Sequence, residues 1–324
     1  MSMRARQWRK LRRIFDPRDF RLANGCREFA QAPQAVVFTD FVRIYFSTRC
    51  RDPAGGGNYL SHVAFVDVAK HSFEILAVAG HTVIPLGRPG CFDEHGIFPL
   101  HVLRHGALLY GYVCGVNRRV SVPVDSAIGL AVSRDQGLTF QRVGRGPLLA
   151  ASLHEPCLIA DPCVRVVNDV FHMWYIFGAG WQRSGTSPTI DRIYKIGHAQ
   201  SPDGVRWAKD DGRQIVSTRL GADECQAMPT VIELAGRHHM FFCFRACHDF
   251  RHNRARAYRL GHAHSDDLLT WTRDDDEMRL ERSADGWDSE MLCYPNVFAC
   301  DDAVYLLYNG NDFGRHGFGV AILD

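Results

Sequence analysis

Residues 162–178, PCVRVVNDVFHMWYIFG, contain two strand-like runs with a turn between them. Pro162 opens the first run, PCVRVV, and Asn168 and Asp169 supply the turn. The second run, VFHMWYIFG, is rich in aromatic and β-branched residues. Such residues favour β-strands, and a short polar turn between two runs is typical of a β-hairpin. The segment therefore predicts an antiparallel pair of strands.

The same pattern occurs five times in the 324-residue chain. Five prolines, spaced by 66, 63, 67 and 66 residues, each open an apolar run that a polar turn and a second apolar run follow: Pro33, Pro99, Pro162, Pro229 and Pro295. A third run keeps the spacing, as IGLAVS at 128–133, IGHAQS at 196–201 and LGHAHS at 260–265, and an acidic turn and an aromatic residue follow each. A fixed period of this kind indicates a repeat architecture, here four strands per unit.

Five four-stranded units predict an all-β fold, a five-bladed β-propeller formed by one domain over residues 1–324. The last unit lacks a fourth strand, and the segment around Trp8 resembles the strands that follow Trp207 and Trp271. We therefore expect the N-terminal strand to complete the last blade, which leaves no open sheet edge between the termini. The predicted blades are 28–80, 94–150, 157–218, 224–282, and 290–324 together with 5–15.

Composition and charge exclude several classes of protein. With 46% apolar residues, 23% charged residues and a net charge of +2, the chain is neither disordered nor a general nucleic-acid binder. No apolar stretch approaches the roughly 18 residues of a transmembrane segment. The basic segment Met1–Phe15 lacks the apolar core of a secretory signal, and we interpret it as a solvated outer strand, with a membrane or polyanion contact as the alternative. Eleven cysteines without a C-x-x-C pair favour a cytoplasmic protein.

Acidic residues recur just before the first strand of each unit, which in a propeller lies at the mouth of the central funnel. The position five residues before the proline is glutamate in four repeats, and the third repeat has an aspartate directly before its proline: Glu28, Glu94, Glu224, Glu290 and Asp161. Crowded carboxylates differ in pKa, and glycoside hydrolysis needs one protonated acid and one ionised carboxylate. These five residues are the catalytic candidates. Alternatively, they cap loops by accepting backbone N–H groups or pairing with arginine.

Arginine occurs after the second strand of every repeat. The planar guanidinium suits carboxylate or phosphate, so these arginines and neighbouring polar residues predict a binding site for a sugar or glycoconjugate with an anionic group. The arginines could equally neutralise the glutamates. The candidates for substrate binding are Arg49, Asp93, Arg118, Arg119, Arg245, Asp249, Arg251, Asn311 and Arg315.

The sequence gives no support for a cofactor or a catalytic metal. Sixteen histidines form no H-E-x-x-H element or Cys/His cluster, and Gly55–Gly57 lacks the lysine and helix of a phosphate loop. No G-x-S-x-G element is present. We expect neither cofactor nor catalytic metal. A structural cation in the channel and the oligomeric state are left open.

The repeat number, the repeat length and the segment ADPCV at 160–164 resemble the five-bladed propeller superfamily of furanosidase-like glycoside hydrolases, which includes families 43, 32, 62, 68 and 130. The segments CREFAQAPQ, CFDEHGIFP, DECQAMPT and WDSEMLCYPNVF are similar to predicted glycosidases of bacterial surface-polysaccharide gene clusters. The resemblance implies an enzyme that cleaves or transfers a glycosyl unit by carboxylate chemistry in the central funnel.

The resemblance also implies roles for particular residues. In family 43 an aspartate modulator stands directly before the third blade's proline, which Asp161 matches, whereas Ala32 and Ala227 occupy the positions of the base and the acid. The pair Glu224-Cys225 is similar to the Glu-Cys of family 32, whose glutamate is the general acid.

We therefore expect Glu224 to donate the proton and Asp161 to tune it, with Glu28 as the nearest replacement for the base. Two alternatives stay open. One is a phosphorylase similar to family 130, in which basic residues hold a nucleophilic phosphate and a single carboxyl donates the proton. The other is a sugar-binding propeller without catalysis.

Overall fold

The computed structural model describes residues 7–183 and 190–324, whose regular structure is nearly all β-strand. The first repeat consists of β2 (Glu28–Val37), β3 (Phe41–Arg51), β4 (Tyr59–Ala69) and β5 (Ile75–Val78). The second consists of β6 (Gly96–His105), β7 (Leu108–Arg118), β8 (Val124–Ser133) and β9 (Gln141–Arg142). One parallel pair, Ser61 of β4 opposite Gly96 of β6, joins these two repeats into a single sheet.

The other repeats form three separate four-stranded sheets with antiparallel neighbours. The third repeat consists of β10 (Ile159–Val167), β11 (Val170–Arg183), β12 (Ile190–Ser201) and β13 (Ala208–Lys209). The fourth consists of β14 (Cys225–Leu234), β15 (Arg237–Arg245), β16 (Arg259–Ser265) and β17 (Thr272–Arg273). The last sheet consists of β18 (Cys293–Cys300), β19 (Ala303–Asn309), β20 (Phe318–Leu323) and β1 (Trp8–Phe15).

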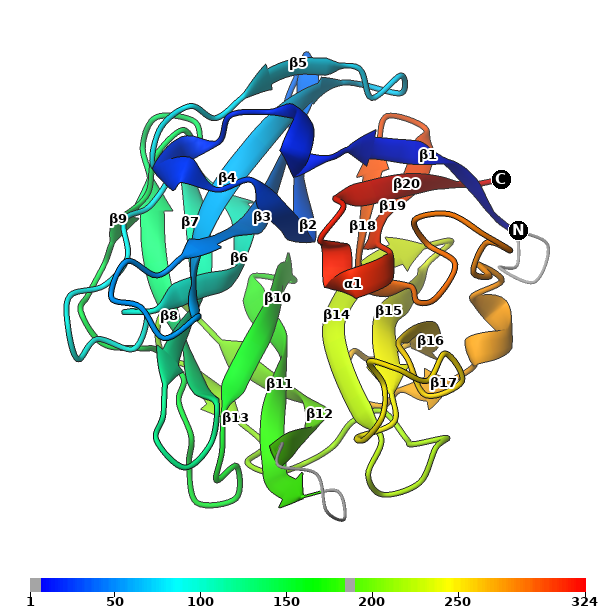
Figure 1. Ribbon diagram of the computed structural model, residues 1–324. Helices are drawn as coiled ribbons and strands as arrows, with labels where there is room; N and C mark the ends of the chain where they lie inside the picture. The colour runs from blue at the N-terminus through cyan, green and yellow to red at the C-terminus, as the bar shows by residue number, and fades with distance from the viewer. Residues whose placement is uncertain (1–6, 184–189) are drawn as a thin grey trace.

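The N-terminal strand completes the last sheet, as the sequence predicts. β1 lies beside β20 (Figure 1) and pairs with it antiparallel, from Trp8 opposite Leu323 to Phe15 opposite Phe318. Trp8 and Phe15 are each 2% exposed, so the strand is held by apolar burial as well as by backbone hydrogen bonds. Residues 5 and 6 of the predicted strand lie outside the described residues.

The first strands of the five repeats surround a common centre (Figure 1). Each of them contacts the next along the chain, and the last contacts the first: β2, β6, β10, β14 and β18. Apolar side chains pack between neighbouring sheets, with Trp174 of β11 against Trp271 and Phe15 of β1 against Phe46 of β3. The core therefore lies between the sheets, and the central region is available for side chains of all five repeats.

The repeating prolines lie inside the first strands, whereas the sequence pattern predicts them at the strand starts. Each first strand shifts its register across the proline: between Gln31 and Gln34, Ile97 and Leu100, Ala160 and Cys163, Ala227 and Thr230, and Cys293 and Asn296. Proline has no N–H to donate, so within a strand it is tolerated at a bulge. The bulges therefore recur along the chain with the same spacing as the prolines.

Helical structure is confined to short turns in the described residues. Three are 3-10 turns, at Pro17–Asp19, Ala23–Gly25 and Asp275–Glu277, and the fourth is α1 (Asn311–Gly314). In residues 7–183 and 190–324, no helix is long and apolar enough to span a membrane.

Candidate active site

The bulges give the residue before each proline an unusual backbone. Four of these residues have positive φ angles, namely Ala32 (51°), Asp161 (53°), Met228 (51°) and Tyr294 (54°), and the fifth, Phe98, precedes a cis peptide bond. Left-handed conformations are uncommon for residues other than glycine and cluster at functional sites. A bulge also redirects the side chain. Phe98, Asp161 and Tyr294 all line one cavity.

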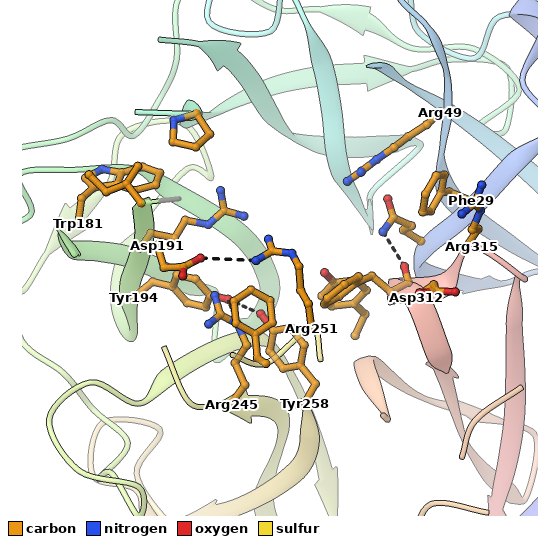
Figure 2. Close-up of a pocket in the computed structure, with 17 residues that line it drawn as sticks. Phe29, Arg49, Trp181, Asp191, Tyr194, Arg245, Arg251, Tyr258, Asp312 and Arg315 are labelled. Carbon is orange, nitrogen blue, oxygen red and sulfur yellow. Dashed lines mark hydrogen bonds and ion pairs between the residues drawn. The ribbon is translucent and has the colours of Figure 1, made fainter. Parts of the chain in front are cut away.

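Two contiguous cavities occupy the central region. The inner cavity has a volume of about 150 Å³ and is lined by residues of all five repeats, including Asp161. The outer cavity has a volume of about 330 Å³ and is shown in Figure 2. Five residues line both cavities: Arg49, Arg192, Tyr194, Tyr258 and Tyr294. A ligand that entered the outer cavity would therefore meet the same side chains that border the inner one.

Asp161 is the only carboxyl group among the described residues that line the inner cavity. Its residue is 5% exposed, and its Oδ2 atom accepts a hydrogen bond from the backbone N–H of Met228 at 3.1 Å. Burial raises the pKa of Asp161 to about 7, because the Met228 N–H and the charge of Arg192 offset the lost hydration only in part. Near neutral pH this carboxyl can hold a proton and donate it.

Three tyrosines surround the passage between the cavities. The hydroxyl groups of Tyr194 and Tyr258 are hydrogen-bonded to each other, and the ring of Tyr258 meets that of Tyr294 with centroids 5.8 Å apart. Burial raises the pKa of Tyr194 to about 12 and the pKa values of Tyr258 and Tyr294 well above the ordinary range. The phenols therefore stay protonated and can donate hydrogen bonds to a ligand's oxygens.

Arg245 is a buried arginine of the outer cavity. It is 3% exposed, donates from Nε to the Tyr194 hydroxyl at 3.2 Å and from Nη1 to the carbonyls of Ala246 and Cys247 at 2.8 and 2.9 Å. Its guanidinium stacks 3.5 Å from the ring centroid of Phe250. These contacts hold the planar guanidinium of Arg245 in place. Because the hydrogen-bond acceptors are neutral oxygens, they do not neutralise its positive charge.

Acidic and basic side chains at the rim of the outer cavity form ion pairs with one another. Arg251 approaches Asp191 at 3.5 Å, drawn as a dashed line in Figure 2, and His248 lies 3.4 Å from the same carboxylate. Arg315 binds Glu28 at 2.8 Å. The rim is therefore an ion-paired border around a deeper, cationic interior.

Glu224, the expected proton donor, lies outside both cavities. It is fully buried, and Arg273 Nη1 lies 2.6 Å from its Oε1 atom. Gln226 donates to Oε1 at 2.9 Å, and the backbone N–H groups of Arg219 and Leu220 donate to Oε2 at 2.8 and 2.9 Å. With both oxygens bonded to protein, the side chain fits the alternative in which these glutamates cap loops and pair with arginine.

The other glutamates of that register also lie outside the two cavities. Glu28 pairs with Arg315, and Glu94 accepts a hydrogen bond from the N–H of Gly90 at 2.8 Å. Glu290 is exposed, and its own N–H donates to the Asn311 side chain at 2.7 Å. The four glutamates five residues before the prolines therefore line neither cavity, whereas three of the residues directly before the prolines, Phe98, Asp161 and Tyr294, line the inner one.

The predicted binding residues divide into two groups. Four of the predicted arginines line the outer cavity: Arg49, Arg245, Arg251 and Arg315. The other five residues lie outside the two cavities: Asp93, Arg118, Arg119, Asp249 and Asn311.

The five residues of the second group make structural contacts instead. Asp93 is fully buried and paired with Arg142, and Arg118 pairs with Asp52. Arg119 pairs with Asp125 and borders a neighbouring groove that Asp191 and Arg251 also line. Asp249 is exposed, and its carbonyl accepts the N–H groups of His252 and Asn253. Asn311 holds the N–H of Glu290.

Several cavity residues are absent from the set that the sequence predicts. Arg192 and Tyr194 stand two apart on β12, so the strand period places them on one face. Tyr294 stands before the repeating proline, as Asp161 does in its own repeat. Asp191 is the second residue of β12, and Tyr258 directly precedes β16. Nothing in the sequence around these two residues distinguishes them from surface residues.

A potential metal cluster exists elsewhere in the described residues. Ligand atoms of His71, Cys300 and Asp301 lie within 4.8 Å of one another. The carboxylate of Asp301 already binds Lys70 at 3.1 Å and His71 at 3.0 Å. None of these residues lines the two central cavities.

Comparison with known proteins gives both relatives and shared folds. No protein-family profile matches the chain. Two Mycobacterium tuberculosis proteins, "Uncharacterized protein MT1551" (strain CDC 1551 / Oshkosh) and "Uncharacterized protein Rv1502" (strain ATCC 25618 / H37Rv), are each 32% identical to it, over 98% of this chain and 99% of the relative.

Three solved structures are similar in fold. A glycosyl hydrolase from Bacteroides ovatus has a TM-score of 0.69 at 13% identity, with 97% of this protein and 93% of that one covered. A thermostable family-43 glycoside hydrolase has a TM-score of 0.62 at 13% identity (91% and 88% covered). A structure from work on the GH130 family of mannoside phosphorylases and the glycoside hydrolases within it has a TM-score of 0.67 at 14% identity (97% and 93%). The protein has the fold of these enzymes, as its resemblance to their superfamily predicts.

Proposed function

The chain belongs to the same family as the Mycobacterium tuberculosis Uncharacterized proteins Rv1502 and MT1551, and we propose that it is a glycoside-cleaving or glycosyl-transferring enzyme on a five-bladed propeller. The observation that carries the proposal is the position of Asp161: a buried carboxyl at the meeting point of five repeats, in a cavity bordered by tyrosines and arginines. The proposal moves the proton donor from Glu224 to Asp161.

The chemistry follows from the protonated state of Asp161. As the glycosidic C–O bond breaks, the carboxyl proton passes to the leaving oxygen, and the resulting carboxylate is stabilised by the Met228 N–H and the charge of Arg192. The tyrosine hydroxyls bind the sugar oxygens. The inner cavity holds the glycosyl unit, and the outer cavity holds the leaving group.

Hydrolysis needs a second group that takes a proton from the attacking water. Asp191 and Asp312 are the carboxyl groups of the described residues that line the outer cavity. Both lie on the side of the leaving group, whereas the base of an inverting hydrolase acts on water at the opposite face of the sugar, so neither is placed for that role.

Phosphorolysis is the second candidate, and the single carboxyl of the inner cavity favours it. In that reaction phosphate attacks the anomeric carbon, Asp161 protonates the leaving oxygen, and no protein base is needed. A requirement for inorganic phosphate separates the two reactions.

The test is turnover of glycosides by the wild-type protein and by Asp161→Asn. A panel of 4-nitrophenyl furanosides and pyranosides, with and without phosphate, reports cleavage by colour. General acid catalysis is worth about 10²–10⁴ in rate, so the variant should lose at least about a hundredfold. Asp266→Asn, in an exposed ion pair with Arg237, is the control. Binding of sugars without turnover by the wild-type protein would favour a binding protein instead.

A further inference from the structure

Three arginines around the two cavities have no acidic partner within residues 7–183 and 190–324. Arg49 and Arg192 line both cavities, and Arg245 lines the outer one. Among the residues that the structure describes, no carboxylate forms an ion pair with any of the three, although ion pairs are formed by Arg251 and Arg315 at the rim. The positive charge is thus concentrated in the interior of the site.

The buried environment of Arg49 is unfavourable for its positive charge. The Nε atom of Arg49 is buried without a hydrogen-bond partner. Burial lowers the pKa of Arg49, and the charge of Arg192 lowers it further. Arg245 is 3% exposed and bonded only to neutral oxygens. Unpaired buried charge is costly, and protein sites that carry it are often matched to a ligand.

The outer cavity has too few acids to balance its arginines. Five arginines line it, whereas Asp191 and Asp312 are the carboxylates of the described residues that do so. Asp191 is held by Arg251 and His248, and Asp312 lies 3.7 Å from His316. A ligand with more than one negative charge would complete the site.

We propose that the outer cavity binds a phosphoryl group carried by the leaving group of the substrate. The inference rests on the proposed function for the direction of the substrate, with its glycosyl unit beside Asp161. A phosphoryl group offers several oxygens to guanidinium forks from different sides. Figure 2 shows Arg49 and Arg315 on one side of the cavity and Arg245 and Arg251 on the other.

The size and lining of the cavity favour a phosphate ester over free phosphate. The volume of about 330 Å³ leaves room for an organic group beside the phosphoryl group. Phe29, Trp181 and Phe313 supply partly exposed aromatic surfaces in the same cavity. Rings of sugars or bases pack on such surfaces, and a bare phosphate would leave them uncovered.

The test is calorimetric binding to the Asp161→Asn protein, which retains the cavity but cannot donate the proton. The probes are methyl glucoside, glucose 1-phosphate, UDP-glucose, glucuronate and inorganic phosphate. We expect a phosphate ester to bind at least tenfold tighter than methyl glucoside and inorganic phosphate. Arg192→Gln and Arg49→Met should each weaken the binding of the phosphate ester at least tenfold more than the binding of methyl glucoside. The matched control is Arg237→Gln, in an exposed ion pair with Asp266 on an outer hairpin.

Three results would overturn the proposal. Inorganic phosphate that binds as tightly as the esters would indicate a co-substrate site, and glucuronate that binds as tightly would indicate a carboxylate site. An equal loss of neutral and phosphorylated ligands in Arg192→Gln would indicate a structural arginine. Arg245→Met is a further variant, and circular dichroism shows whether it folds. Cleavage of neutral glycosides by the wild-type protein and its loss in Asp161→Asn test the proposed function separately.

Discussion

The side chain of Asp161 accepts the backbone N–H of Met228, and these two residues occupy the same position in consecutive repeats. Each stands directly before the repeating proline with a positive φ angle, 53° and 51° respectively. The bulge of one repeat therefore donates a hydrogen bond to the carboxyl that the bulge of the previous repeat turns toward the centre. The donor proposed for catalysis and its support arise from one repeated backbone feature.

The activity of this protein should require the protonated form of Asp161. Because the pKa of this carboxyl is raised to about 7, kcat/KM should decrease roughly tenfold per pH unit above that value. A pH–rate profile from pH 5 to 9 with the best glycoside checks the expectation. A rate that stays constant up to pH 9 would exclude Asp161 as the acid.

The carboxyl group of Asp161 should also lower the free energy of unfolding at high pH. An aspartate with a raised folded-state pKa is neutral in both states at low pH, but above pH 7 the folded protein must ionise it at a cost that the unfolded chain does not bear. Asp161→Asn should therefore be more stable than the wild type at pH 8, on the order of 2–4 kcal/mol, and the difference should shrink toward pH 4. Urea unfolding at both pH values measures it, and a variant less stable at pH 8 contradicts it.

Glu224→Gln should impair stability instead of catalysis. The change removes one of the two carboxylates that hold the buried guanidinium of Arg273, at 2.6 Å, and leaves Asp275 at 3.0 Å as the other. Losing a hydrogen bond to a charged group of this kind costs about 1.5–3 kcal/mol. The folded fraction should retain the wild-type kcat. Glu224→Gln combined with Arg273→Met should recover part of the stability, since no buried guanidinium then remains and Asp275 keeps Arg219 as its partner at 3.4 Å. A large loss of kcat at unchanged stability would return the acid role to Glu224.

Sequence reasoning identified the repeats because the period of strand, turn and aromatic residue follows from local chemistry. It placed Asp161, Arg49 and Arg245, which line the central cavities, among the candidates because these stand at fixed places in the repeat. It ranked Glu224 first because four glutamates share a register, and register alone does not tell which way a side chain points. The bulge at the X-Pro step decides the direction, and its positive φ angles cannot be inferred from the letters Ala, Asp, Met and Tyr.

Acid should destabilise the fold through buried histidine pairs. His172 contacts His198 at 3.1 Å and His239 contacts His262 at 3.0 Å, and burial lowers the pKa of His198, His239 and His262 to about 4. The unfolded imidazoles take up protons below about pH 6.5, so stability should be lost from there down to about pH 4.

Each imidazole contributes a slope of up to about 1.4 kcal/mol per pH unit. The measurement is best made in the Asp161→Asn protein, because wild-type Asp161 gives the opposite slope over this range. His262→Gln should flatten the dependence. Equal unfolding free energies at pH 6.5 and 4.5 would contradict the expectation.

The pairing of β1 with β20 has a consequence for biosynthesis. Trp8 pairs with Leu323, so β1 cannot find its partner until β20 has been synthesised. Until then β1 has no neighbouring strand, and its apolar face stays exposed. The hairpins between β1 and β20 can meanwhile fold in the order of their synthesis. The pairing of β1 with β20 therefore follows the folding of the hairpins between them, and a nascent chain that stalls before Phe318 would present an open strand edge to chaperones and proteases.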